Sequence, residues 1–250
     1  LLFDLSEFDS GVVTIKHTDS RRAEILGTLE QILEGRSLSA KQAEVLRGRL
    51  HWFNSYLFVR APCDAMRRLS VRAQGRDASA ALDGSVEHAI LTFKNHLETA
   101  PPLRLCPASG RNMYVFIDSS LSFEPGLDTV AGIGGVLYDQ SGNAVQHFSA
   151  EISGTDLERL LGDSDHPIYE VELAAVMVAF EAWMSLLRDT YSVFYVDNEA
   201  AQSTLVSGRS STRNRRAILQ RILNAEHQAL CRPWFGRVPS YSNPADPPSP

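Results

Sequence analysis

The order of hydrophobic patterns in the second half of the chain restricts its fold to a small set. Three segments with the character of strands come first, over 112–118, 131–139 and 144–152. The first is a continuous apolar run, the second is rich in glycine, and the third alternates between apolar and polar residues. A long apolar helix, a buried strand, two helices and a short strand follow, over 169–187, 192–198, 199–208, 212–231 and 232–239. We therefore expect residues 112–249 to form an α/β domain with a five-stranded mixed sheet, in the order β-β-β-α-β-α-α-β.

The first 104 residues differ, because their apolar residues recur at helical spacing, for example over 20–35. The tetrapeptide SAKQ matches a capping box, in which Ser39 caps a helix and Gln42 reaches back to it. The stretch 100–112 contains three prolines and a glycine, so we place a domain boundary there. We therefore expect a separate, mainly helical segment over 1–104.

Composition and charge narrow the class of protein. The chain has 250 residues, of which 44% are hydrophobic and 22% charged, and its net charge is −6. No apolar stretch approaches the roughly 18 residues that cross a membrane, so we expect no membrane association. The first residues lack the regions of a signal peptide, and the chain begins without methionine, which suggests a fragment of a longer protein. Three widely spaced cysteines predict reduced thiols and an intracellular protein, with nucleus or cytoplasm left open.

Four acidic residues are expected at the ends of elements within 112–249: Asp118, Glu172, Asp197 and Asp246. Asp118 and Asp197 each end an apolar strand. A crossover through the long helix makes these two strands parallel, so both aspartates leave the sheet at one end, where α/β sheets form their sites. The long helix would bring Glu172 to the same point.

Carboxylates that share a confined site repel one another, and a hard divalent cation removes that repulsion. Mg²⁺ prefers oxygen ligands, and two such ions about 3.5–4 Å apart can activate a water and stabilise the leaving oxygen of a phosphodiester. We therefore expect a site for two Mg²⁺ ions, with Mn²⁺ as a substitute, that hydrolyses phosphodiesters. Glu170 competes with Glu172 for this role, but it lies roughly 200° round the helix and should face elsewhere.

Five segments in order resemble the ribonuclease H domain of retroelement reverse transcriptases, in particular those of the DIRS/Ngaro-like group. They read FIDSS, AGIGGVLYD, VELAAVMVAFEAW, YVDNEAA and SNPADPPS, within residues 112–249. The resemblance implies a ribonuclease H-like fold and Mg²⁺-dependent endonucleolytic hydrolysis of the RNA strand of RNA–DNA hybrids. It also implies that the metal ligands and catalytic residues are Asp118, Glu172, Asp197 and Asp246.

Residues 1–104 are similar to the thumb and connection segment that follows the polymerase palm in these elements. The matching stretches read FDLSEFDSG and GRLHWFNSYLFVRAPCDAMRRL. No YxDD-type motif or similar pair of aspartates occurs in the sequence, so we expect no polymerase activity from this chain. The expected partners are therefore an RNA–DNA hybrid or other nucleic acid, and the palm of a parent polyprotein.

Contacts with nucleic acid are expected around the segment GRSSTRNRR, residues 208–216, which carries four arginines and no acid. These arginines would ordinarily be a solvated helix start, but arginine is unfavourable at a helix N-terminus because of the macrodipole, which points to phosphate contact as an equal alternative. The net charge of −6 argues mildly against a dedicated duplex-binding domain. The residues expected to bind nucleic acid are Ser119, Asn198, Arg209, Arg213, Arg215 and Arg216.

Other readings of these residues stay open. Taken singly, an aspartate after a strand is usually a turn former or a helix cap, and Glu172 would be an ordinary helix acid. A phosphoacceptor receiver domain also has aspartates at strand ends, but it needs a parallel sheet rather than an antiparallel meander. The loop GRVPSYSNPAD lacks the histidine of many relatives, and no closing helix follows DPPSP. The alternative is a catalytically inactive ribonuclease H-like module, decayed or domesticated, that binds nucleic acid or serves as a scaffold.

Overall fold

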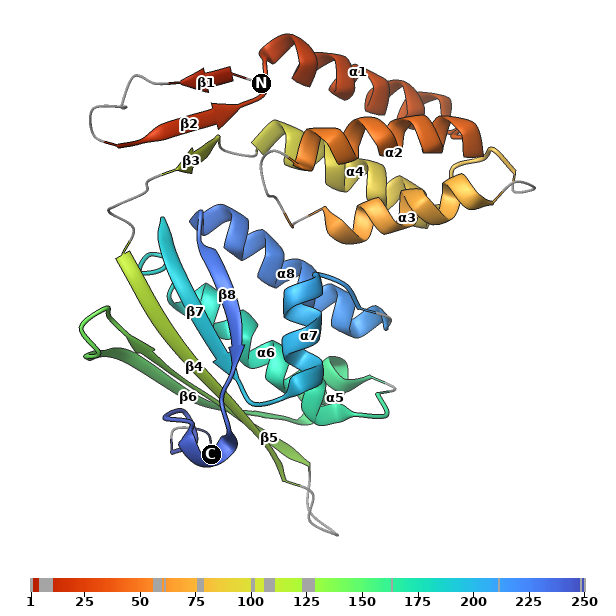
Figure 1. Cartoon of the computed structure of the whole chain (residues 1–250). Helices are drawn as coiled ribbons and strands as arrows, with labels where there is room; N and C mark the ends of the chain where they lie inside the picture. The colour runs from red at the N-terminus through yellow and green to blue at the C-terminus, as the bar shows by residue number, and fades with distance from the viewer. Residues whose placement is uncertain are drawn as a thin grey trace. The chain divides into compact units, whose positions relative to one another are not determined.

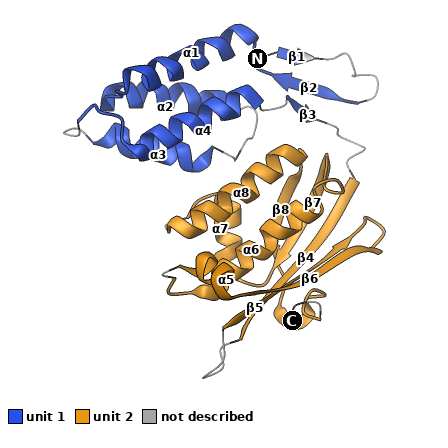
Figure 2. Cartoon of the chain, turned by 180° about the vertical axis from the view of Figure 1, so that it is seen from behind, with its two compact units in different colours: residues 1–109 blue, residues 110–250 orange. Residues whose placement is uncertain are grey.

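The computed structural model of the chain describes residues 2–4, 11–55, 60, 62–75, 79–99, 102–105, 111–122, 129–162, 164–210, 212–247 and 249. The chain divides into two compact units, residues 1–109 and 110–250 (Figure 2). The division falls within the proline-containing stretch 100–112, much of which lies outside the described residues. Across the described ranges, no helix has the length and apolar character needed to span a membrane.

In its described part, the first unit combines four helices with a small antiparallel sheet (Figure 1). The helices are α1 (Asp19–Gly35), α2 (Ala40–Ser55), α3 (Cys63–Gln74) and α4 (Gly84–Thr99). The sheet has the order β1-β2-β3, over Leu2–Asp4, Val13–Lys16 and Leu103–Leu105. The helical character was expected, but the sheet was not. Its strands are only three or four residues long, and β3, which comes near the end of the unit's sequence, pairs with β2 near its beginning.

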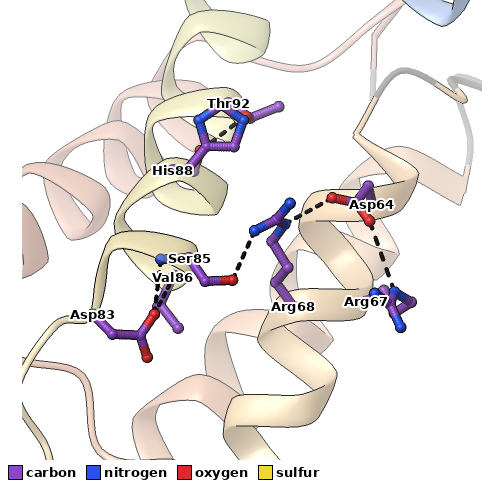
Figure 3. Close-up of polar contacts among 8 residues, drawn as sticks. All are labelled: Asp64, Arg67, Arg68, Asp83, Ser85, Val86, His88 and Thr92. Atoms are coloured by element: carbon purple, nitrogen blue, oxygen red, sulfur yellow. Dashed lines mark hydrogen bonds and ion pairs between the residues drawn. The ribbon is translucent and has the colours of Figure 1, made fainter. Parts of the chain in front are cut away.

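The starts of α2 and α4 follow capping signals of the sequence. Ser39 and Gln42 form the predicted capping box, because each donates its backbone amide to the other's side-chain oxygen, at 2.8 and 3.3 Å. Asp83 caps α4 in a similar way. Its Oδ1 accepts hydrogen bonds from the amides of Ser85 and Val86, at 2.8 and 2.9 Å (Figure 3).

Polar side chains also link α3 to α4. Arg68 donates from Nε to Oδ2 of Asp64 and from Nη1 to Oγ of Ser85, both at 2.7 Å (Figure 3). Leu69 of α3 and Phe93 of α4 belong to the buried core of the same unit. Burial of apolar surface supplies the main favourable free energy, and the polar link helps to fix how the two helices meet.

Arg72 is expected to stabilise the first unit, because it is buried near the end of α3 and donates to backbone carbonyl oxygens. Its guanidinium donates to those of Leu38 at 2.8 Å, Ala81 at 3.1 Å, and Ser79. Replacing Arg72 with methionine should lower the free energy of unfolding by about 2–4 kcal/mol, because these acceptors lose a charged donor. The control, Arg67→Met on the more exposed side of the same helix, should change it by less than about 0.5 kcal/mol. Urea unfolding followed by far-UV circular dichroism measures both variants, and equal midpoints would contradict this role for Arg72.

The second unit contains a five-stranded mixed sheet in the order β6-β5-β4-β7-β8, which confirms the predicted fold class (Figure 1). The strands β4 (Arg111–Ser122), β5 (Val130–Tyr138) and β6 (Ala144–Ser153) form the expected antiparallel meander. The strand β7 (Thr190–Val196) lies parallel to β4, and β8 (Arg232–Arg237) lies parallel to β7. The crossover between β6 and β7 therefore makes β4 and β7 parallel neighbours, as expected.

Helices α6 (Pro167–Ala182) and α8 (Arg213–Ala229) pack together over one face of this sheet (Figure 2). Most side chains in the middle of α6 are buried, which explains its nearly continuous apolar sequence. Two shorter helices are α5 (Gly154–Leu161) and α7 (Glu199–Ser207). The first of these was not expected. It has eight residues, of which only Leu157 is buried, and such a short segment shows no clear helical periodicity.

Candidate active site

Asp118 lies where β7 stops pairing with β4. The parallel ladder between these strands ends at Phe116, whereas the antiparallel ladder with β5 continues as far as Ser122. The prediction that Asp118 ends its strand is therefore wrong, because β5 continues to pair with the polar residues that follow it. Asp197 comes directly after β7, so the two aspartates still meet at one end of the parallel pair.

Glu172 is buried on α6 and approaches the two aspartates from the helix. Pro167 is favoured at the helix start, where its missing amide leaves no hydrogen bond unmade. Farther along, Glu172 is 1% exposed, and its Oε2 accepts a hydrogen bond from Oγ of Ser119 at 2.5 Å. Its Oε1 is buried and has no hydrogen-bond partner within the described residues. A buried oxygen in this state suits a ligand that the protein itself does not supply.

Burial and neighbouring negative charge oppose the ionisation of Glu172 and of Asp118. Burial, with smaller contributions from the charges of Asp197 and Asp118, raises the pKa of Glu172 to about 8, against the hydrogen bond from Ser119. Burial also raises the pKa of Asp118, and the charge of Asp197 adds to that rise. The acids are therefore close enough to interact electrostatically, and the surroundings of Glu172 favour its protonated form.

The last residue of β8 and the segment after it hold Asp197 in place. Oγ of Ser240 donates to Oδ2 of Asp197 at 2.7 Å, and Nε of Arg237 donates to its backbone carbonyl oxygen at 3.3 Å. Ser240 begins a short 3-10 helix, Ser240–Ser242, after which the chain lies against β4 (Figure 1). Asp197 is thus oriented by a neutral side chain from a segment that is distant in the sequence.

Asn243 is a residue of this site that sequence reasoning missed. It is 5% exposed, and its Nδ2 donates to the carbonyl oxygen of Ile117 at 2.8 Å and to Oδ1 of Asp118 at 3.2 Å. Its Oδ1 accepts from the amide of Ala245 at 3.2 Å. Asn243 therefore ties the C-terminal segment to β4 and orients Asp118. The available signal was the motif SNPAD, from which only Asp246 was selected.

Asp246 is more exposed than the other three acids. Its backbone amide donates to the carbonyl oxygen of Asn243 at 3.1 Å, within a turn. Its charge contributes to the raised pKa of Asp118, after the larger effects of burial and Asp197. Asp246 therefore lies near the other acids without being buried among them.

Arg215 has to be removed from the expected contacts with nucleic acid. Its side chain is 11% exposed, and its Nε donates to Oε1 of Glu170 at 2.6 Å. Glu170 is itself buried and points toward α8, whereas Glu172 points toward β4, as the helical geometry predicted. A buried guanidinium that is bound to a buried carboxylate is not available to a phosphate at the surface.

Two further residues expected to bind nucleic acid make contacts within the protein. Ser119 donates to Glu172, and Oδ1 of Asn198 accepts from the amide of Ala201 at 3.0 Å as the cap of α7. The remaining three are exposed or partly exposed around the start of α8, and they stay predicted contacts: Arg209, Arg213 and Arg216.

The acids suit a hard divalent cation in their chemistry, although they do not surround one point in the structure. Among the described residues, no three His, Cys, Asp or Glu side chains are grouped so that they could hold one metal ion. Their carboxylates accept from neutral side chains instead, namely Ser119, Ser240 and Asn243. The donor set is nevertheless the one that Mg²⁺ prefers, and one oxygen of Glu172 is buried without a partner. The chemistry of these residues therefore suits Mg²⁺, and the Mg²⁺ site stays a prediction.

Comparison with known proteins gives structural matches without a sequence family. No family model matches the chain, and neither does any curated protein. Ribonuclease H1 of the halophilic archaeon Halobacterium salinarum NRC-1 is 19% identical with a TM-score of 0.42, over 55% of this chain and 94% of that one. A ribonuclease H1 isolated from compost by a metagenomic approach is 19% identical with a TM-score of 0.44, over 55% and 92%. The foamy viral protease-reverse transcriptase in complex with RNA/DNA hybrid is 12% identical with a TM-score of 0.40, over 73% and 28%.

Proposed function

We propose that the second unit is a metal-dependent ribonuclease H, which hydrolyses the RNA strand of RNA–DNA hybrids as part of a retroelement reverse transcriptase. The observation that supports this most is the buried carboxyl group of Glu172 beside Asp118 and Asp197, at the end of two parallel strands. Carboxyl groups that are buried close together destabilise the folded state, and such groups are found mainly at functional sites. Hydrolysis of a phosphodiester with two Mg²⁺ ions is a reaction that requires such a group of acids.

The four acids that would hold the ions are Asp118, Glu172, Asp197 and Asp246. Bound Mg²⁺ would supply a nucleophilic water and stabilise the leaving oxygen. The protein's own contribution is to orient the carboxylates. Ser119 donates a hydrogen bond to one oxygen of Glu172, and Asn243 donates one to an oxygen of Asp118.

The nucleic-acid side of the proposal rests on the arginines at the start of α8. Arg209, Arg213 and Arg216 lie on the same unit as the acids and would neutralise backbone phosphates. Selection for a hybrid would come from contacts with the 2′-hydroxyl groups across a wide, shallow minor groove. The first unit would then be a thumb and connection segment, and the polymerase palm of a DIRS/Ngaro-like element would be its partner.

A catalytically inactive module is the second candidate. The observations that favour it are the absence, among the described residues, of three acids grouped to hold one ion, and the exposure of Asp246. In that case the unit would bind nucleic acid or other proteins through the same fold, and the acids would be remnants.

Cleavage of a labelled RNA–DNA hybrid in the presence of Mg²⁺ or Mn²⁺ separates the two candidates. We expect metal-dependent cutting of the RNA strand in the hybrid, and no cutting of duplex DNA or duplex RNA. Chelation of the metal should stop the reaction. A folded sample that cuts no substrate with either ion would overturn the enzymatic proposal in favour of the binding module.

A further inference from the structure

The first turn of α6 is anchored to both helices that follow β7. Arg215 of α8 donates from Nε to Oε1 of Glu170 at 2.6 Å and from Nη2 to Oγ of Ser164 at 3.1 Å. Its guanidinium also lies over the ring of Tyr169, 4.2 Å from the centroid. The hydroxyl of Tyr169 shares a hydrogen bond with Oγ1 of Thr204 on α7. One arginine therefore joins α8 to the residues that begin α6.

The cost of burying this ion pair indicates a role beyond stability. Glu170 is 1% exposed, and its second oxygen, Oε2, has no hydrogen-bond partner within the described residues. A buried pair with one unsatisfied oxygen pays a large desolvation penalty, and apolar residues of similar size are often equally stabilising. An apolar pair would lack the directional hydrogen bonds by which Arg215 fixes how the start of α6 meets α8.

We propose that the Glu170–Arg215 pair positions Glu172 for the reaction. Glu172 lies two residues after Glu170, about 3 Å farther along the helix axis. Its side chain is held by Ser119 at Oε2, while Oε1 has no partner within the described residues, so the location of Glu172 depends on the helix that carries it. Glu170 and Arg215 are positioning residues in this account, which rests on the proposed nuclease function.

The same two helices supply a matched control. Arg221 of α8 donates from Nη2 to Oε1 of Glu181 on α6 at 2.7 Å. Their side chains are 60% and 43% exposed, and Glu181 lies about three helical turns from Glu170 along α6. The two pairs therefore join the same helices through the same residue types, but only the Glu170–Arg215 pair lies beside Glu172.

The test compares Glu170→Leu/Arg215→Met with Glu181→Leu/Arg221→Met in the full chain, by steady-state cleavage of the RNA–DNA hybrid. We expect kcat to fall by about 10–100-fold in the first variant, because a shift of about 1 Å in a catalytic group has an effect of this size. We expect KM for the hybrid to change by less than about threefold, since the phosphate contacts are untouched. The concentration of Mn²⁺ that gives half-maximal rate should rise in the same variant. The control should leave all three quantities near those of the wild type.

A conservative variant keeps the proposal testable if the double variant does not fold. Arg215→Lys retains the charge but loses the planar contacts with Ser164 and Tyr169, so its kcat should be reduced and should lie above that of Arg215→Met. A folded variant of Glu170 or Arg215 with unchanged kcat and unchanged Mn²⁺ dependence would overturn the positioning role alone. A wild-type chain that cuts no hybrid would overturn the nuclease function itself, and the positioning role with it.

Discussion

Replacing Asp118 with asparagine is expected to remove hybrid cleavage without unfolding the chain. The carboxylate would be a ligand of the proposed Mg²⁺ site, and metal stabilisation of the transition state amounts to several kcal/mol, so its loss should lower the rate by about 1000-fold or more. Asp118 is 7% exposed, and burial is the main cause of its raised pKa. A neutral amide costs less free energy to bury than a carboxylate, and its oxygen can still accept the hydrogen bond from Asn243. The unfolding midpoint of the metal-free variant should therefore equal or exceed that of the wild type.

The control for this variant is an aspartate of the same unit that lies away from the acids. Asp156 on α5 serves, because its side chain is 81% exposed and its ion pair with Arg159 lies at the surface. Asp156→Asn should change neither the cleavage rate nor the stability. The double variant Asp118→Asn/Asp197→Asn should be as inactive as the single variant. Hybrid cleavage at the wild-type rate by the double variant would show that these acids do not carry the reaction.

Replacing Glu172 with glutamine is expected to stabilise the metal-free protein at alkaline pH. Burial raises the pKa of Glu172 to about 8 in the folded protein, from 4.5 for the free side chain. Between these two values the unfolded chain has lost a proton that the folded protein keeps, so the free energy of unfolding falls as pH rises. Over the whole interval this single group should lower it by about 3–5 kcal/mol. Glutamine does not titrate in this pH range, so the free energy of unfolding of the variant should fall less steeply as pH rises.

Urea unfolding of both proteins at about pH 5 and about pH 8.5, in the presence of a chelator, measures the effect directly. The difference between variant and wild type should be small at the lower pH and large at the higher one. In saturating Mn²⁺ the wild type should become the more stable of the two proteins, because the ion binds its carboxylate and not the amide of the variant. Identical slopes for the two proteins would contradict a buried, protonated Glu172, and no effect of Mn²⁺ would contradict metal binding by it.

Local sequence patterns were sufficient for most of the second unit. The order of strands and helices, the parallel pairing of β4 with β7 and the opposite orientations of Glu170 and Glu172 all follow from periodicity and from the crossover rule. The extension of β4 beyond Asp118 did not follow. The polar residues after Ile117 end the apolar pattern, and they stay in the strand because β5 pairs with them. Pairing of this kind depends on a distant segment, which local periodicity does not report.

The misassigned and missed residues share the same physical reason. Arg215 belongs to a basic segment that suggests a solvent-facing patch, yet it is buried by a partner 45 residues earlier in the chain. Asn243 contacts Asp118 across 125 residues, and an asparagine before a proline otherwise indicates no more than a turn. In both cases the role of the side chain is set by tertiary packing. The sequence predicted that Asp118, Glu172 and Asp197 lie close together, but it did not predict the residues that contact them.

The measurement that tests the central claim most directly is the binding of Mn²⁺ to the full chain and to its Asp118→Asn variant, by isothermal titration calorimetry without nucleic acid. If Asp118, Glu172 and Asp197 form a metal site, the wild type should bind Mn²⁺ and release protons, because Glu172 must ionise to become a ligand. The heat should then depend on the ionisation enthalpy of the buffer. The variant should bind at least about 10-fold more weakly, as expected when one carboxylate ligand is lost. Equal binding by both proteins, without proton release, would contradict the assignment of these acids as a metal site.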